Sequence, residues 1–333
     1  MNREERRELS TYVRKTLKRK VKEIEFPGGK TRDSVRVILE TDQSLIATKR
    51  PSDKRAKREL AVLKILKANG ATVPKVYGFN GRFLLQQDLG NQRLSQMLHD
   101  EDAPLTIHQQ LDAALTSMVE YQNAARAVEL ETKMMPIGHE IEWRRGLSNV
   151  PHELAEMIGI TPPAYDADQV ADLLKVTTPN FVKWDSRPGN AIVSPKGIGY
   201  WFDWEHCGVR NAADDLVWLM ADEFVTYDKS MEAELFAKHM ESFAIGRSVE
   251  ETERYVRVLG VFHSCVRLQL VFDNKGDGDW WSLTKCLNGD KVGVVRRCCR
   301  RLVWRAAAWA DHDPVTRPLV PWFQQIEEYF EAL

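Results

Sequence analysis

The hydrophobic pattern of the 333-residue chain changes near residue 90, and this change restricts the possible folds more than any other feature. Before that point, short segments rich in β-branched residues alternate apolar and polar positions, which is typical of strands. After it, apolar residues recur mainly at spacings of three and four, which favours helices. The sequence therefore predicts an α+β fold of two lobes, residues 1–90 and residues 91–333, with the boundary at residues 88–92.

The first lobe is predicted to be a mostly antiparallel five-stranded sheet. After the third strand, the segment 52–70 has a helical period, with Ser52 as a possible cap and Asn69-Gly70 as its stop. The charged N-terminus predicts one more, amphipathic helix. Such a helix can lie on a membrane surface, but packing against the next lobe is the favoured interpretation. Its apolar stripe consists of Leu9, Tyr12, Val13, Leu17, Val21 and Ile24.

Composition and charge limit the function classes. The formal net charge is −1, so bulk charge gives no support for nucleic acid as a partner. The five cysteines include no CxxC pair, which argues against a disulfide framework or a zinc site and fits a reducing compartment. The N-terminus lacks the apolar stretch of a signal peptide, and no run of 18 apolar residues occurs. We therefore expect a cytoplasmic protein with no transmembrane segment.

The stretch FVKWDSRPGNAIV, residues 181–193, places a carboxylate and an amide on a loop between two apolar segments. Pro188 and Gly189 exclude a regular helix between Asp185 and Asn190. Asp203 follows a second apolar strand, so a hairpin would bring the three side chains together. Their oxygens suit Mg²⁺, which is held by few protein ligands together with substrate phosphates. Asp185, free of the metal, would orient an attacking hydroxyl.

These residues resemble the motifs of the aminoglycoside phosphotransferase family, the small-molecule branch of the protein-kinase-like superfamily. That family usually reads H-G-D-x-x-x-x-N, followed by a strand that ends in D-W-E. The resemblance implies a two-lobed protein-kinase-like fold that binds ATP, or GTP in its place, and Mg²⁺. It implies Asp185 as the catalytic residue, Asn190 and Asp203 as metal ligands, and Asp215 in a supporting role. The reaction would transfer the γ-phosphoryl group to a hydroxyl of a small molecule.

The first lobe offers matching positions for the nucleotide. Lys49 lies where a third-strand lysine of such folds reaches the phosphates, and Glu59 lies where a helix glutamate pairs with that lysine. In the loop 27–34, Ser34 or Thr31 would hold a phosphate together with backbone N–H groups, although an ordinary hairpin turn explains that loop equally well. The segment LLQQDLG resembles the hinge, where the backbone groups of Gln87 and Leu89 would bind adenine.

The sequence departs from the family at Lys183 and Trp184, which replace the usual His-Gly. We expect Lys183 to brace the loop or face solvent rather than bind phosphate. Glu205, after Asp203, would touch metal or substrate, or equally brace the loop.

The acceptor is expected to be a sugar, an amino sugar or an amino alcohol. Residues 128–175 carry nine acidic and four basic side chains, which suits a cation, whereas the basic stretch 285–305 argues the other way. A nucleotide-binding regulator with little catalysis is the alternative. A protein kinase is less favoured, because no recognisable activation segment follows Asp203.

Overall fold

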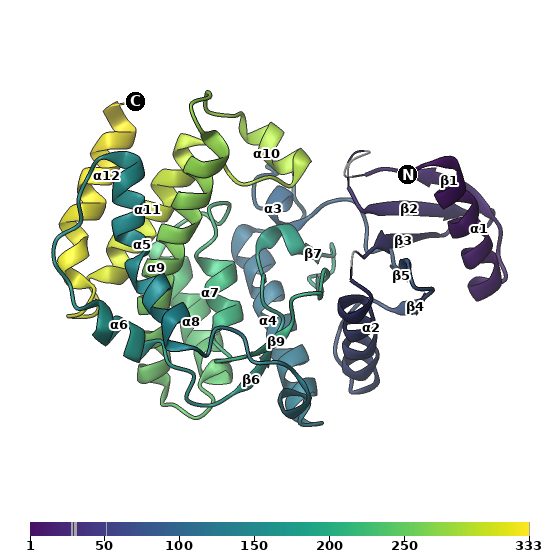
Figure 1. Ribbon diagram of the computed structural model, residues 1–333, viewed down its shortest axis with the longest axis horizontal. Helices are drawn as coiled ribbons and strands as arrows, with labels where there is room; N and C mark the ends of the chain where they lie inside the picture. The colour runs from purple at the N-terminus through teal and green to yellow at the C-terminus, as the bar shows by residue number, and fades with distance from the viewer. Residues whose placement is uncertain (28, 30–31, 51, 333) are drawn as a thin grey trace.

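The computed structural model describes residues 1–27, 29, 32–50 and 52–332. Figure 1 shows a small sheet lobe beside a larger helical body, joined by the chain between β5 and α3. The five strands are antiparallel, in the order β1-β2-β3-β5-β4, and the helix α2 follows β3. The α+β architecture expected from the sequence, with a five-stranded sheet lobe and a larger helical lobe, is confirmed. The bounds are β1 Val21–Glu25, β2 Ser34–Leu39, β3 Ser44–Lys49, α2 Asp53–Ala68, β4 Val76–Phe79 and β5 Phe83–Gln87.

The N-terminal helix α1, Arg3–Leu17, covers one face of this sheet. Asn2 and Glu5 form a capping box at its start, and Lys18 ends it in the left-handed conformation with φ 56°. The predicted apolar stripe extended beyond the end of the helix, because Val21 and Ile24 belong to β1, where pairing with β2 provides partners for their backbone hydrogen bonds. The helix packs its apolar side on the sheet of its own lobe, and not on the next lobe as the favoured interpretation expected.

Strand β3 divides its side chains between two environments, because successive residues of a strand point to opposite faces. Leu45 and Ala47 pack with Leu9 of α1 in a buried cluster. Ile46 and Thr48 instead line the cavity between the lobes. This alternation decides which cation at the end of the strand reaches the cavity.

The helical lobe contains two short β-ribbons that carry the candidate site. In the first, β6 (Asn180–Val182) pairs with β9 (Gly208–Arg210), and in the second, β7 (Ala191–Val193) pairs with β8 (Gly199–Trp201). The helices are α3 Leu94–Met97, α4 Ile107–Arg126, α5 Ile141–Ile158, α6 Ala167–Leu173, α7 Asp214–Met220, α8 Lys229–Phe243, α9 Val249–Lys275, α10 Leu283–Gly289, α11 Arg296–Ala310 and α12 Val320–Ala332. Short 3-10 helices lie at Leu130–Lys133, Pro188–Asn190 and Arg317–Leu319.

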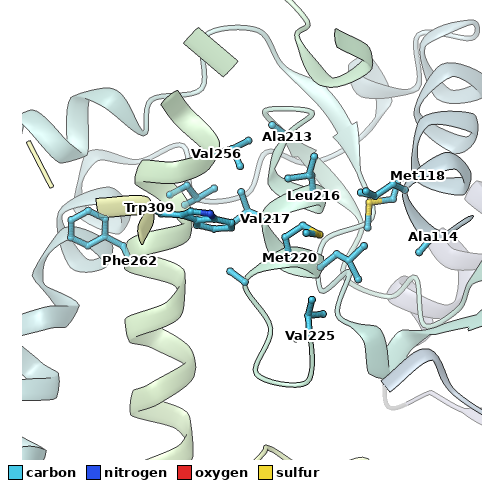
Figure 2. Packing of buried hydrophobic residues seen from close by; sticks show 14 of the residues in the cluster. Ala114, Met118, Ala213, Leu216, Val217, Met220, Val225, Val256, Phe262 and Trp309 are labelled. Atoms are coloured by element: carbon cyan, nitrogen blue, oxygen red, sulfur yellow. The ribbon is translucent and has the colours of Figure 1, made fainter. Parts of the chain in front are cut away.

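The main core surrounds α7. Figure 2 shows Leu216, Val217 and Met220 of α7 between Met118 of α4 and Phe262 of α9. Because α7 is held on several sides, the residues at its first turn have fixed positions, and these residues contact the candidate site.

Helix α9 is long and apolar enough to cross a membrane, and 72% of its most apolar window is buried inside the protein. Such burial is what the core helix of a soluble protein shows. All five cysteines are buried and free.

Candidate active site

The hairpin of β7 and β8 forms as predicted and brings the two motifs to one end. Ala191 pairs with Trp201, and the N–H of Phe202 donates to the carbonyl oxygen of Asn190 at 3.0 Å. The loop that carries Asp185 and Asn190 therefore lies beside Asp203, which follows β8 directly.

Asp185 and Asn190 are in direct contact. The Asn190 Nδ2 donates to Oδ2 of Asp185 at 2.8 Å and to its carbonyl oxygen at 3.0 Å. Trp184, Asp185 and Asp203 all lie in the left-handed region, with φ of 57°, 52° and 61°. A non-glycine residue in this region costs on the order of 1–3 kcal/mol, so the surroundings must hold all three in place.

Asp215, in the first turn of α7, holds the loop from below. Its fully buried carboxylate accepts hydrogen bonds from the N–H groups of Lys183 and Trp184 and from the Ser186 hydroxyl, each at 2.8 Å, and from the Tyr121 hydroxyl at 2.7 Å. Burial raises the pKa of Asp215, and these donors oppose that rise. The supporting role implied by the family resemblance is thus visible in its contacts.

Lys183 ties the two halves of the site together. Its side chain is fully buried, and Nζ donates to the carbonyl oxygens of Asp185 at 3.2 Å and Asp203 at 3.1 Å. Nζ also lies 5.8 Å from the ring centroids of Trp201 and Trp204. Burial lowers the pKa of Lys183, while nearby carboxylates oppose that change. Of the expected alternatives for Lys183, loop bracing is the one that the structure shows.

The expected pair of Lys49 and Glu59 does not form. Lys49 Nζ binds Glu5 of α1 at 3.0 Å, on the sheet face away from the cavity. Arg50 binds Glu59 instead, through Nε at 2.9 Å and Nη2 at 3.0 Å. The alternation of β3 places Lys49 on the face of Leu45 and Ala47 and turns the next residue, Arg50, toward the cavity.

Arg50 connects the sheet lobe with the second motif. Its Nη2 lies 2.8 Å from Oδ1 of Asp203, and its Nη1 lies 3.3 Å from Glu205. Burial alone would lower the Arg50 pKa, but three carboxylates raise it above its ordinary value. Burial would likewise raise the Asp203 pKa, but the charges of Arg50 and Lys183 hold it below its ordinary value. Arg50 and Asp203 are therefore both charged near neutrality.

A cavity of about 490 Å³ lies between the lobes, and most of the expected nucleotide residues line it. Ser34, Gln87 and Leu89 are on its wall together with Asn190 and Asp203. The Ser34 hydroxyl lies 2.9 Å from that of Thr48, and the N–H of Gln87 donates to the Lys75 carbonyl oxygen at 2.7 Å. Thr31, the alternative to Ser34, lies outside the described residues.

The donor atoms at the end of the hairpin fit Mg²⁺. Asn190 commits its amide nitrogen to Asp185 and so has its amide oxygen to offer, and Asp203 is a charged carboxylate. Within residues 1–27, 29, 32–50 and 52–332, no three His, Cys, Asp or Glu side chains group as a metal site. Two protein oxygens are what Mg²⁺ takes when substrate phosphates supply further ligands.

The sequence reasoning missed two residues of the candidate site. Arg50 is adjacent to the residue that was chosen, and only the strand register separates them. Arg187, two residues after Asp185, binds Asp290 from a distant segment, with Arg187 Nη1 at 3.1 Å from Asp290 Oδ1. Its position close to Asp185 in the sequence could have marked Arg187 as a residue of the site. No local sequence pattern, however, predicts a partner 103 residues away.

A family model described as "Phosphotransferase enzyme family" matches residues 22–239 of the chain. This match covers the sheet lobe, the hairpin of the two motifs and α7. No curated protein matches the chain.

Solved structures of similar fold cover nearly the whole chain. An aminoglycoside phosphotransferase from Alicyclobacillus acidocaldarius shares 9% identity over 93% of each chain, with a TM-score of 0.57. The choline kinase LicA from Streptococcus pneumoniae shares 15% identity over 92% of this chain and 99% of its own, with a TM-score of 0.52. The ternary complex of APH(2")-IIa with streptomycin and ATP shares 14% identity over 85% of this chain and 93% of its own, with a TM-score of 0.50. At these identities the likeness shows the fold.

Proposed function

The chain belongs to the phosphotransferase enzyme family and is a small-molecule phosphotransferase, and from this premise we propose that it transfers the γ-phosphoryl group of ATP, with Mg²⁺, to a hydroxyl of a sugar, an amino sugar or an amino alcohol. One observation carries the proposal. Asp185 and Asn190 are hydrogen-bonded at 2.8 Å, and Asn190 and Asp203 line one cavity of about 490 Å³ between the lobes. Asp185, as the proton acceptor, and Asn190 and Asp203, as the Mg²⁺ ligands, would therefore lie close together, where ATP and the hydroxyl substrate would meet.

On the acceptor side, Asp185 would orient the attacking hydroxyl and accept its proton. Asn190 fixes Oδ2 of the carboxylate through its hydrogen bond, and Arg187 Nε lies 3.5 Å from Oδ1. A carboxylate held in this way presents one fixed lone-pair direction to an incoming hydroxyl. Positioning supplies much of the rate in phosphoryl transfer, because the transition state asks for little covalent chemistry from the protein.

On the donor side, Asn190 and Asp203 would hold Mg²⁺. The ion, when bound, would neutralise charge that develops on the phosphates. Arg50, positioned by Glu59, takes the role that the sequence gave to Lys49, since it is the cation on the cavity side of β3. Ser34 would contribute to phosphate binding, and Gln87 and Leu89 would meet the base. We propose residues 1–90 as the donor lobe and residues 91–333 as the acceptor lobe.

The names of the similar structures support the choice of donor and acceptor. They include a choline kinase, which supports an amino alcohol, and aminoglycoside phosphotransferases, which support an amino sugar. One of them holds ATP, and GTP has no comparable support. Five free cysteines fit a reducing compartment, so we place the protein in the cytoplasm.

An acceptor panel tests the proposal. Purified protein is incubated with ATP, MgCl₂ and individual amino alcohols, sugars and amino sugars, and the products are examined by mass spectrometry for the mass of one added phosphoryl group. We expect phosphorylation of at least one acceptor class, and its loss when EDTA removes Mg²⁺. Phosphate transfer to protein substrates alone, or nucleotide binding without transfer across the panel, would contradict the proposal.

A further inference from the structure

One carboxylate at the mouth of the cavity meets guanidinium groups from three distant segments. Arg187 of the catalytic loop binds Asp290 with both terminal nitrogens, Nη1 to Oδ1 at 3.1 Å and Nη2 to Oδ2 at 3.3 Å. Arg32, between β1 and β2, lies 3.7 Å from Oδ2, and Arg93, before α3, also contacts Oδ2. The Asp290 side chain is only 10% exposed. We call these four residues the arginine cluster.

The catalytic loop leaves room for the Asp290 carboxylate at Gly189. A side chain at Gly189 would place its Cβ 2.5 Å from Oδ1 of Asp290, so glycine leaves the space that Asp290 fills. Asp290 itself is left-handed, with φ 46°, at the end of α10. Arg32 Nη2 also donates to the carbonyl oxygens of Gly289 and Asp290, at 2.5 and 2.9 Å. The tip of α10 therefore joins the sheet lobe to the catalytic loop.

The charges of the arginine cluster do not balance. Three guanidinium groups face Asp290, and Arg187 Nε also lies 3.5 Å from Asp185 Oδ1, so three positive charges meet two carboxylates on a wall that includes Asn190 and Asp203. Arg187 offers its whole terminal fork to Asp290, and the fork is the geometry with which arginine binds phosphate. A phosphate and the Asp290 carboxylate therefore compete for the same donors, and like charge separates them.

Helix α10, which ends just before Asp290, has its own small core, while Val294 after Asp290 belongs to the main core. Cys286 of α10 packs with Phe224 and Cys298 in a cluster separate from the main one. Figure 1 shows α10 beside α3, on the side of the helical body nearest the sheet lobe. A short helix that rests on a small satellite cluster opens at lower free energy than the main core does. Opening of α10 would therefore withdraw Asp290 while the main core stays packed.

We propose that Arg32, Arg93 and Arg187 form an anion site for the terminal phosphate of the nucleotide donor, and that Asp290 is a built-in competitor which closes this site as a latch. The inference rests on the proposed function in one respect, the identity of the donor. It makes Asp290 a residue that lowers donor affinity and couples donor binding to the release of α10.

The variant Asp290→Asn tests the latch directly. It removes the competing charge and keeps the size of the side chain, and Asp279→Asn, an exposed position in the connection between α9 and α10, is the matched control. Titration calorimetry with Mg·ATP should show binding to Asp290→Asn about tenfold tighter than to the wild type, because one charge-assisted contact no longer competes. The control should bind like the wild type. Tripolyphosphate, which lacks the base, should show the same order of affinities.

The reverse order of affinities for Mg·ATP would contradict the proposal that Asp290 competes with the phosphate. Unchanged or weaker binding by Asp290→Asn would mean that Asp290 positions the arginines for the donor, and absence of binding by the wild type and both variants would equally contradict the anion site. Binding by Asp290→Asn alone would support a latch that is firmly closed.

Hydrogen exchange of the wild type gives a second readout that needs no variant. Mg·ATP should speed exchange of the amides in residues 283–295, whereas slower exchange there would contradict release of α10. Both readouts report donor binding and not transfer, so the latch can fail while the proposed phosphotransferase activity holds, and the reverse.

Discussion

Arg50 donates two hydrogen bonds to Glu59, of 2.9 and 3.0 Å, while its neighbour Lys49 points to the other face of the sheet and binds Glu5. The same guanidinium lies 2.8 Å from Asp203. One arginine therefore links the sheet, α2 and the second motif. In this protein the cation at the end of β3 that faces the cavity is therefore a planar guanidinium group, which binds Glu59 through two nitrogens, and not the single ammonium group of a lysine.

The first prediction separates the two adjacent cations. Arg50→Met should lower kcat/KM for ATP about 100-fold or more, because it removes a buried charge from the cavity in which we propose that the phosphates bind. Lys49→Met should leave kcat/KM within about twofold and cost at most about 1 kcal/mol of stability, since Lys49 is partly exposed and Glu5 keeps Arg82 as a partner. Steady-state kinetics and urea unfolding measure both effects. A large loss of activity in Lys49→Met with a mild effect in Arg50→Met would contradict the assignment.

The contrast between these residues shows how far the sequence reasoning reached. The sheet and its single inserted helix were predictable, because alternation and caps are local signals. The hairpin of Asp185, Asn190 and Asp203 was predictable because a turn and two short strands fix it. The choice between Lys49 and Arg50 was not, since a shift of one residue exchanges the faces of a strand.

Long-range partners lay beyond local patterns altogether. Arg32 meets Asp290 across 258 residues, and no periodicity or motif points from one to the other. The same holds for Glu5, whose side chain turns toward Lys49 only because α1 covers that face of the sheet. The buried position of Lys183 also depends on Trp201 and Trp204, which close around it from the second motif.

The second prediction concerns the brace under the catalytic loop. Asp215→Asn should lower the free energy of unfolding by about 2–4 kcal/mol, because hydrogen bonds to a charged, buried acceptor are strong and the amide introduces donors that face other donors. Tyr121→Phe removes only one of the five hydrogen bonds to this carboxylate, the fifth of which comes from Gln122 at 3.4 Å, and serves as the graded comparison. Urea unfolding measures both variants. Equal stability of Asp215→Asn and the wild type would contradict the bracing role.

The third prediction concerns the lysine that replaces the family histidine. Lys183→Met keeps the length of the side chain but leaves the carbonyl oxygens of Asp185 and Asp203 without their donor. We expect kcat to fall about 10- to 100-fold, because the loops that carry the site lose their common tie. KM for ATP should change by less than kcat does. A variant with wild-type kcat would show that Lys183 does not position the loops.

The fourth prediction is a pH dependence of stability at His263. Burial, with the nearby charge of Arg267, lowers the pKa of His263 from 6.5 to about 3. Between these two pH values, His263 is protonated in the unfolded chain but not in the folded protein. The free energy of unfolding should therefore fall as pH drops from 6.5 toward 3, by up to about 1.4 kcal/mol per pH unit.

His263→Phe is the matched variant, because it keeps a ring against Trp218 and cannot titrate. Urea unfolding at pH 7, 6 and 5 should show a shallower loss for this variant than for the wild type. Parallel pH profiles of the two proteins would contradict the prediction.

The most direct test of the central claim is the turnover of Asp185→Asn on the best acceptor of the panel, measured beside its affinity for Mg·ATP. The substitution keeps the shape of the side chain and removes the proton acceptor. We expect a loss of kcat of about 100- to 10,000-fold, the usual range for a general base, with the dissociation constant of Mg·ATP changed by less than about threefold. Turnover close to that of the wild type would contradict the role of Asp185 and, with it, the proposed mechanism.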